Sequence, residues 1–153
     1  LRNAALYNST HGRLSPETVL VKDTDEEVQA VVDDWGLERA RRVAAGEVFV
    51  PPFTAPALRQ GRAQRNHRLD LYGLGAVAYF MPTGQVPSEP VTADSGPTPP
   101  STLHVHPDID EAVDEIVLTA LAANPADRQN SVYEFQTAIK RILPATSHTD
   151  AVS

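Results

Sequence analysis

One stretch of the sequence reads LDLYGLGAVAYFM and covers residues 69–81. It is apolar on almost every side, and a helix of that kind is buried all round. We therefore predict a central helix over residues 69–81, ended by Pro82 and Gly84. Its single charged residue is Asp70, in the first helical turn, where the helix dipole favours a carboxylate.

Two further helices are predicted after a proline-rich segment. Residues 82–107 contain seven prolines, a composition typical of a loop. Beyond it, apolar residues recur at helical spacing, first at Val113, Ile116, Val117, Ala120 and Leu121, then at Val132, Phe135, Ile139 and Ile142. Ser131 and Glu134 have the spacing of a capping box, which marks the start of the second helix.

The residues before the central helix predict a small hairpin. Two runs rich in branched side chains, 19–21 and 28–32, flank a polar turn. Residues 1–8 read as the end of a helix with no start signal, so we expect the sequence to be a fragment of a longer chain. Residues 144–153 read as a disordered tail.

The composition excludes several classes of protein. The chain has 153 residues, no cysteine and a net charge of −7. Without cysteine there are no disulfides, thiolate zinc sites or cysteine nucleophiles. No apolar run approaches the length of about 20 residues that crosses a membrane, and no signal region is evident, so we expect a cytoplasmic protein. The acidic balance argues against a nucleic-acid partner.

The charge is unevenly distributed. Residues 38–68 contain seven arginines and two glutamates, a basic stretch within an acidic chain. Such a stretch could bind a phosphorylated Ser or Thr of the same segment, could dock an acidic surface of a protein partner, or could be a solvated arginine face. All three interpretations stay open at the level of sequence.

Five segments share an order and spacing that point to one family. They read HGRLSPETVLV (11–21), DWGL (34–37), FTAPA (53–57), DLYGLG (70–75) and ALAANPADR (120–128). Together they resemble the C-terminal lobe of eukaryotic-like Ser/Thr protein kinases. In order, they are similar to the catalytic loop, the Asp-Phe-Gly metal motif, the Ala-Pro-Glu motif, the buried central helix and the last helix pair.

The resemblance implies a fold and a domain organisation. We expect an α+β, mainly α structure, the protein-kinase-like C-lobe with its small β-hairpin, over residues 1–143. The proline-rich segment 82–107 would be an insert or loop, and the N-lobe would be absent from this chain.

The same resemblance locates the catalytic positions, and three of them are altered. The family uses a catalytic-loop Asp to orient the substrate hydroxyl, and Asn and Asp side chains to hold magnesium ions on ATP. Arg13 stands at the position of the catalytic Asp, and a guanidinium has no acceptor lone pair. Ser15 replaces a phosphate-steering Lys, and Thr18 replaces the magnesium-binding Asn. Asp34 retains the hard oxygen ligand that magnesium prefers.

These departures imply a pseudokinase that acts as a regulatory module, descended from enzymes that move the ATP γ-phosphoryl group to a protein hydroxyl. ATP and magnesium are expected for the intact family domain, with Thr18 and Asp34 as their contacts, and the partner would be a protein. Arg13 could pair with a phosphate or with Asp34. Two alternatives remain: an atypical active kinase in which Asp33 or a neighbour supplies the base, and an interaction scaffold that needs no nucleotide.

Two residues of this lobe are expected to be structural. His11 should pack within the catalytic loop. Asp70 should be buried and should accept hydrogen bonds from the backbone of that loop, as its counterpart does in related kinases.

Arg128 is a third structural candidate, with a missing partner. It matches the Arg that pairs with the Glu of Ala-Pro-Glu, but the Glu position is Ala57. A buried guanidinium without its carboxylate is costly. We therefore expect Arg128 to be exposed, or paired instead with Asp127 or Asp114.

Overall fold

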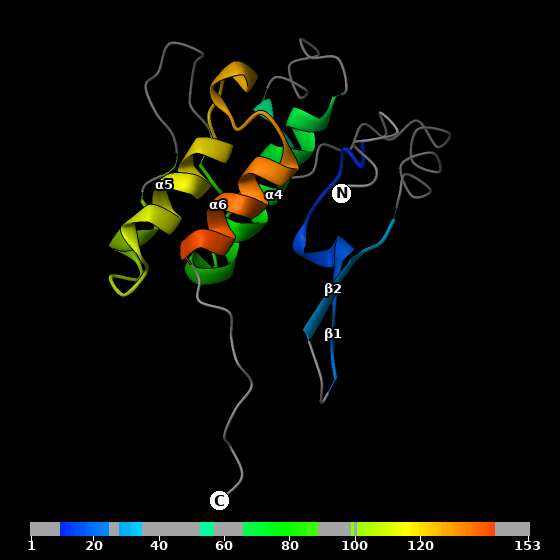
Figure 1. Ribbon diagram of the computed structural model, residues 1–153, viewed down its shortest axis with the longest axis horizontal. Helices are drawn as coiled ribbons and strands as arrows, with labels where there is room; N and C mark the ends of the chain where they lie inside the picture. The colour runs from blue at the N-terminus through cyan, green and yellow to red at the C-terminus, as the bar shows by residue number, and fades with distance from the viewer. Residues whose placement is uncertain are drawn as a thin grey trace, which may run out of the picture.

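The computed structural model describes residues 10–24, 28–34, 53–56, 66–88, 99 and 101–142. Figure 1 shows three α-helices packed together and a two-stranded hairpin beside them. The elements in chain order are η1 (Pro16–Thr18), β1 (Val19–Asp23), β2 (Val28–Val32), α4 (His67–Thr83), η2 (Thr102–His104), α5 (Glu111–Ala120), η3 (Pro125–Asp127) and α6 (Val132–Ile142). The predicted mainly helical architecture with a small hairpin is confirmed.

Helix α4 is the central element of the bundle. It packs against α5, α6 and η2, and side chains on several of its sides are buried, among them Leu71 and Ala76, which have no exposed surface. Two apolar clusters meet on it. One contains Tyr72, Val77 and Val117, and the other contains Leu71 and Phe135. The prediction drawn from its all-round apolar sequence is therefore confirmed.

Both ends of α4 lie two residues beyond the predicted bounds of 69–81. The helix begins at His67, where Asn66 accepts a hydrogen bond from the amide of Arg68 at 3.0 Å. Pro82 does not end it: the helix continues to Thr83, and Gly84 caps it in the left-handed conformation, with φ of 64°. Pro82 lies one residue before the end of the helix, so a kink at this position affects only the last turn.

The contact between α4 and α5 depends on Gly75. A Cβ atom at this position would lie 2.7 Å from the Cβ of Ala120. Because real carbon atoms do not approach so closely, the two helix backbones can meet here only if residue 75 has no side chain.

We expect Gly75→Ala to lower the free energy of unfolding by about 1–3 kcal/mol, the usual cost of overpacking. Removing the opposing methyl group should recover part of that loss, so Gly75→Ala/Ala120→Gly should be more stable than Gly75→Ala. Urea unfolding of the three proteins measures both effects. An unchanged or raised midpoint for Gly75→Ala would contradict the close packing.

The segment Phe53–Pro56 is anchored on α4 by an aromatic contact. The rings of Phe53 and Phe80 meet edge to face, with centroids 5.6 Å apart and an interplanar angle of 83°. Phe53 and Ala55 are both buried. The adjoining residues 35–52 and 57–65, which include Ala57 and six of the arginines of the basic stretch, lie outside the described residues.

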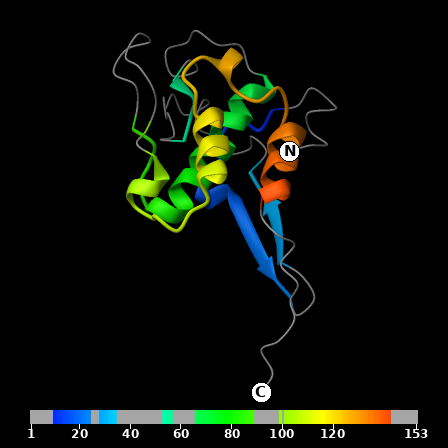
Figure 2. The same cartoon turned by 60° about the vertical axis from the view of Figure 1, so that its left-hand side comes forward.

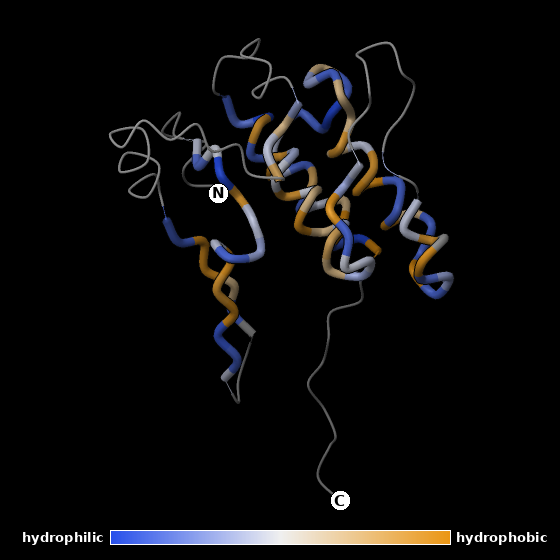
Figure 3. The backbone as a smooth tube through the Cα atoms, turned by 180° about the vertical axis from the view of Figure 1, so that it is seen from behind, coloured by the Kyte–Doolittle hydropathy of each residue, from blue (hydrophilic) through white to orange (hydrophobic). Residues whose placement is uncertain are grey.

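The hairpin is antiparallel, as its sequence predicts. Leu20 faces Val31 and Val21 faces Ala30 across the two strands. Within the described structure Leu20, Val21 and Val31 remain more than half exposed. Figure 2 shows the hairpin extending away from the helices, and Figure 3 shows apolar residues along it.

The last two helices begin at side-chain caps. Asp110 accepts a hydrogen bond from the amide of Ala112 at 2.8 Å and caps α5. Ser131 accepts one from the amide of Glu134 at 3.1 Å. The Glu134 carboxylate reaches back to the amide of Asn130, one residue earlier than in a regular capping box.

Among the described residues, no helix has both the length and the apolar character needed to cross a membrane. The helix predicted at residues 1–8 and the tail predicted at 144–153 lie outside the described residues.

Candidate functional site

The candidate site is formed where the loop of residues 11–18 meets residues 33–34 and the first turn of α4. Asp70 joins the loop to the helix: its two carboxylate oxygens accept hydrogen bonds from the amides of His11, at 2.9 Å, and Gly12, at 2.7 Å. Gly12 has a φ of 70°, a conformation that glycine adopts without steric cost. This backbone geometry turns two successive amides toward one carboxylate.

Asp70 has little contact with water, because its side chain is only 4% exposed. Burial raises the pKa of Asp70 above its usual value, and the hydrogen bonds from Gly12 and His11 oppose that rise. The desolvation of the carboxylate therefore outweighs its two hydrogen bonds. Asp70 nevertheless provides an acceptor for the buried amide of His11 and for the half-buried amide of Gly12.

His11 joins the loop to the segment that carries Asp34. Its side chain is buried, and its Nε2 lies 2.7 Å from the carbonyl oxygen of Asp33. Its Nδ1 accepts a hydrogen bond from the amide of Arg13 at 3.3 Å. Because an amide can only donate, the tautomer that satisfies both contacts carries its proton on Nε2 and donates it to Asp33.

Ser15 and Thr18 point into the protein. Both are less than 7% exposed. The Thr18 hydroxyl accepts a hydrogen bond from the amide of Ser15 and donates to the carbonyl of Ser15, each at 3.0 Å. The Ser15 hydroxyl donates to the carboxylate of Glu17, also at 3.0 Å. Both hydroxyl groups are thus engaged within the turn formed by η1.

Arg13 and Asp34 form an ion pair. The Nη1 of Arg13 lies 2.8 Å from the Oδ2 of Asp34, and the two side chains are 18% and 22% exposed. Asp34 has a φ of 56°, in the left-handed region that Asp tolerates better than most residues. Of the two partners considered for Arg13 from the sequence, the described structure contains Asp34.

The oxygen donors around Asp34 do not match what magnesium requires. Magnesium takes near-octahedral coordination by oxygen, whereas the Asp34 carboxylate is bound to a guanidinium and the Thr18 hydroxyl is bound to backbone. In the part of the chain that the structure describes, no three His, Cys, Asp or Glu side chains gather closely enough to hold a metal ion.

Arg128 lies away from this site and is buried, with 3% of its surface exposed. Its guanidinium donates to three backbone carbonyls: those of Ala122 at 2.8 Å, Arg68 at 2.7 Å and Ala123 at 3.3 Å. It also lies over the ring of Tyr72, 5.0 Å from the centroid. Arg128 therefore joins the start of α4 to the chain that leaves α5.

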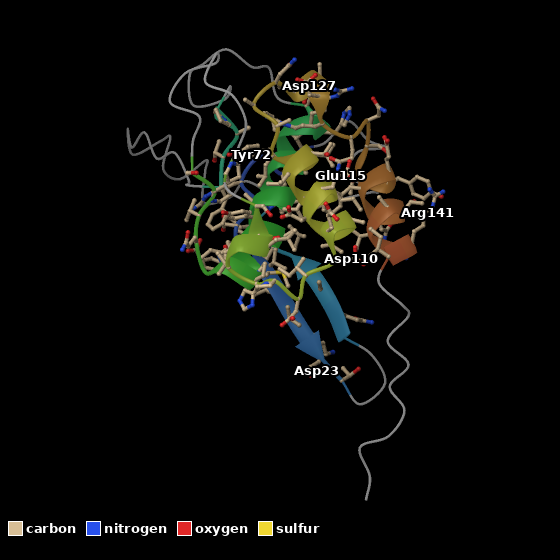
Figure 4. The ribbon with its side chains drawn as sticks, turned by 90° about the vertical axis from the view of Figure 1, so that its left-hand side faces the viewer. Asp23, Tyr72, Asp110, Glu115, Asp127 and Arg141 are labelled. Carbon is tan, nitrogen blue, oxygen red and sulfur yellow. The ribbon has the colours of Figure 1, made fainter. Side chains whose placement is uncertain are left out.

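The expectation that Arg128 would be exposed or paired with Asp127 or Asp114 was wrong. Asp127 is exposed at the outer edge of the bundle (Figure 4). Asp114 is buried and accepts hydrogen bonds from the Ser101 hydroxyl and from the amide and hydroxyl of Thr102. Carbonyls beyond the end of α5 have no helical donors, so they bind Arg128 in place of a carboxylate.

The one arginine of the basic stretch that the structure describes is also engaged with backbone. Arg68 donates to the carbonyl of Pro125 at 2.6 Å and to the side chain of Asn130 at 3.2 Å. Sequence reasoning missed this role, and it missed Tyr72 as a partner of Arg128. A hydrogen bond to a backbone carbonyl leaves no signal in the sequence, because every residue has a carbonyl.

Comparison with known proteins supports the kinase resemblance. No family model matches the chain. It is 29% identical over 150 residues to the serine/threonine-protein kinase pkn3 of Myxococcus xanthus, covering 86% of this chain and 27% of that protein. It is also 29% identical over 156 residues to Pkn1 of the same organism, covering 94% of this chain and 22% of that protein.

Solved structures agree with this result. The kinase domain of PknI from Mycobacterium tuberculosis has a TM-score of 0.67 and 28% identity, covering 92% of this chain and 49% of that domain. A structure described as PpkA-294 in its apo form has a TM-score of 0.71 and 19% identity, which is a likeness of fold alone. The chain spans about a quarter of the curated relatives and half of the solved chains. Its sequence homologues include bacterial Ser/Thr protein kinases, and its mainly helical fold with a two-stranded hairpin matches that of kinase domains.

Proposed function

We propose that this chain is the C-lobe part of a Ser/Thr protein-kinase-like domain, over residues 1–143, that has lost most of its capacity for phosphoryl transfer. It acts as a pseudokinase, a regulatory module that keeps the fold and works through a protein partner. Residues 82–107 are its proline-rich insert, and 144–153 are its tail.

The observation that carries the proposal is the ion pair between Arg13 and Asp34. By the resemblance, these residues stand at the positions of the catalytic base and of the metal-binding carboxylate. A guanidinium cannot accept the proton of a substrate hydroxyl. Here it also neutralises the carboxylate that would hold magnesium, so one substitution affects two parts of the machinery.

The orientation of Ser15 and Thr18 supports the same proposal. Catalysis in the family needs a cation and an amide oxygen directed at the nucleotide. Both hydroxyls instead point into the loop and bind neighbouring groups of the same turn. The loop thus keeps its backbone shape through local hydrogen bonds and presents none of the three altered catalytic groups in its usual role.

Phosphoryl transfer tests this proposal directly. The full-length protein that carries this sequence is incubated with magnesium, γ-labelled ATP and a generic Ser/Thr protein substrate, beside an active kinase as positive control. We expect the wild type to incorporate no more label than Asp34→Ala, because loss of a catalytic base alone costs about 10²- to 10⁴-fold in rate. Circular dichroism establishes that both proteins are folded.

Transfer by the wild type that Asp34→Ala abolishes would contradict the proposal and favour an active kinase with a relocated base. Asp33, which is exposed and adjoins Asp34, is the candidate for that base. Asp33→Ala would then abolish transfer as well. Partner binding that does not respond to ATP would instead favour an interaction scaffold.

A further inference from the structure

The Arg13 side chain places a positive charge where the family resemblance would place a metal ion. Its Nη1 lies 2.8 Å from the Oδ2 of Asp34. We infer that Arg13 is the resident cation of this site and that the site excludes divalent metals. This inference rests on the proposed function, and it identifies Arg13 as the source of the positive charge beside Asp34.

The two partners are fixed by contacts on either side of them. Gly12, directly before Arg13, donates its amide to Asp70 at 2.7 Å. Asp33, directly before Asp34, accepts a hydrogen bond from buried His11 at 2.7 Å, and its own amide donates to the carbonyl of Thr18 at 2.9 Å. The two backbone segments are thus tied together independently of the ion pair. The backbone therefore already holds Arg13 and Asp34 close to each other, and no backbone reordering is needed for the guanidinium to reach the carboxylate.

The Arg13 guanidinium competes with any divalent ion for the Asp34 carboxylate. A divalent ion would have to displace it from Asp34, or bind beside it against like-charge repulsion. Among the described residues no group of three or more His, Cys, Asp or Glu side chains surrounds Asp34, so a cluster of such side chains does not offset either route.

Thr18 does not offer a second oxygen ligand. Thr18 is 6% exposed, and its hydroxyl is bound to the amide and carbonyl of Ser15. Turning it toward Asp34 would leave the buried Ser15 amide without an acceptor. The orientation of Thr18 within the loop and the charge of Arg13 therefore both disfavour metal binding at Asp34.

Binding of Mn²⁺, followed by electron paramagnetic resonance of the free ion, tests this inference on the full-length protein. We expect no Asp34-dependent binding in the wild type, so that wild type and Asp34→Ala titrate alike. Arg13→Asp replaces the competitor with a second carboxylate, and we expect its affinity for Mn²⁺ to rise at least about tenfold. That gain should disappear in Arg13→Asp/Asp34→Ala.

Two further variants control for net charge and folding. Arg141→Asp makes the same change of charge at an exposed position on α6 (Figure 4) and should titrate like the wild type. Arg13→Gln removes the charge and leaves a shorter, neutral polar side chain. It should show a smaller gain than Arg13→Asp, and it tests the inference if Arg13→Asp does not fold.

The inference is overturned if wild type binds Mn²⁺ through Asp34, or if neither Arg13 variant binds it more tightly than wild type. Metal binding without phosphoryl transfer would overturn this inference alone, whereas Asp34-dependent transfer would overturn the proposed function as well.

Discussion

Arg128→Ala should lower the free energy of unfolding by about 3–5 kcal/mol, because it removes a buried charged group that satisfies several backbone atoms. The guanidinium donates to the carbonyls of Arg68, Ala122 and Ala123 and lies over the ring of Tyr72. An alanine leaves these carbonyls with fewer donors and opens a cavity between the start of α4 and the end of α5. Urea unfolding followed by circular dichroism measures the loss.

Arg141→Ala is the matched control, since Arg141 is exposed on α6 and its loss should change stability by less than about 0.5 kcal/mol. Arg128→Lys should fall between wild type and Arg128→Ala, because an ammonium group lacks the planar fork that reaches all three carbonyls. Equal stability of wild type and Arg128→Ala would show that the carbonyls do not depend on this side chain.

The Arg128 effect should be constant from pH 6 to pH 9. Burial lowers the pKa of Arg128 to about 10, Tyr72 opposes this shift, and Arg68 adds to it. The guanidinium therefore remains charged throughout that range. Because its pKa is lower in the folded state, the folded protein would gain relative stability only as the pH rises through about 10.

Asp70→Ala is the second substitution with a large expected effect. It removes the acceptor of the amides of His11 and Gly12, which are at 2.9 and 2.7 Å. Each buried amide left without a partner costs about 1–3 kcal/mol, so we expect a loss of about 2–5 kcal/mol. Hydrogen exchange should show lost protection at these two amides before global unfolding, because they connect the loop to α4.

Asp110→Ala is its control. Asp110 also accepts a hydrogen bond from an amide, but at the exposed start of α5, where loss of a cap costs about 1 kcal/mol. If Asp70→Ala costs no more than Asp110→Ala, the buried hydrogen bonds of Asp70 contribute nothing beyond an ordinary helix cap.

The titration of Asp70 makes the stability of the protein depend on pH. Burial raises its folded-state pKa above the usual 3.8, so the folded protein binds this proton more tightly than the unfolded chain does. The part of the stability that depends on the protonation of Asp70 is therefore fully present below 3.8 and falls as the pH rises through the higher folded value. Asn cannot titrate. The wild type should therefore lose stability relative to Asp70→Asn as the pH rises across that window.

The helices show which features of the fold can be predicted from local sequence. The all-round apolar character of residues 69–81 predicted a central helix, and the spacing of Val132 and Phe135 predicted the buried face of α6. Side-chain periodicity and caps depend on residues a few positions apart, so they can be recognised without the rest of the fold. Pro82 was misjudged because its cost depends on how close to the end of the helix it lies.

The candidate site was only partly predictable. The spacing of the five segments identified Arg13, Ser15, Thr18 and Asp34 as altered positions and left a phosphate or Asp34 as partner for Arg13. Sequence could not say that the Thr18 hydroxyl turns inward, because this depends on the backbone path through η1. It also could not choose between Asp34 and a phosphate, since Arg13 and Asp34 are 21 residues apart.

Local sequence predicted the three long helices and the hairpin that the structure describes, and it identified the chemical groups in the loop at residues 11–18. The partners of the charged side chains followed from how the chain packs. Arg128 is bound by carbonyls up to 60 residues away, and Asp70 by amides 58 and 59 residues away. Backbone groups are the same at every position, so their pairing with a distant side chain is set by packing and cannot be read from residue types.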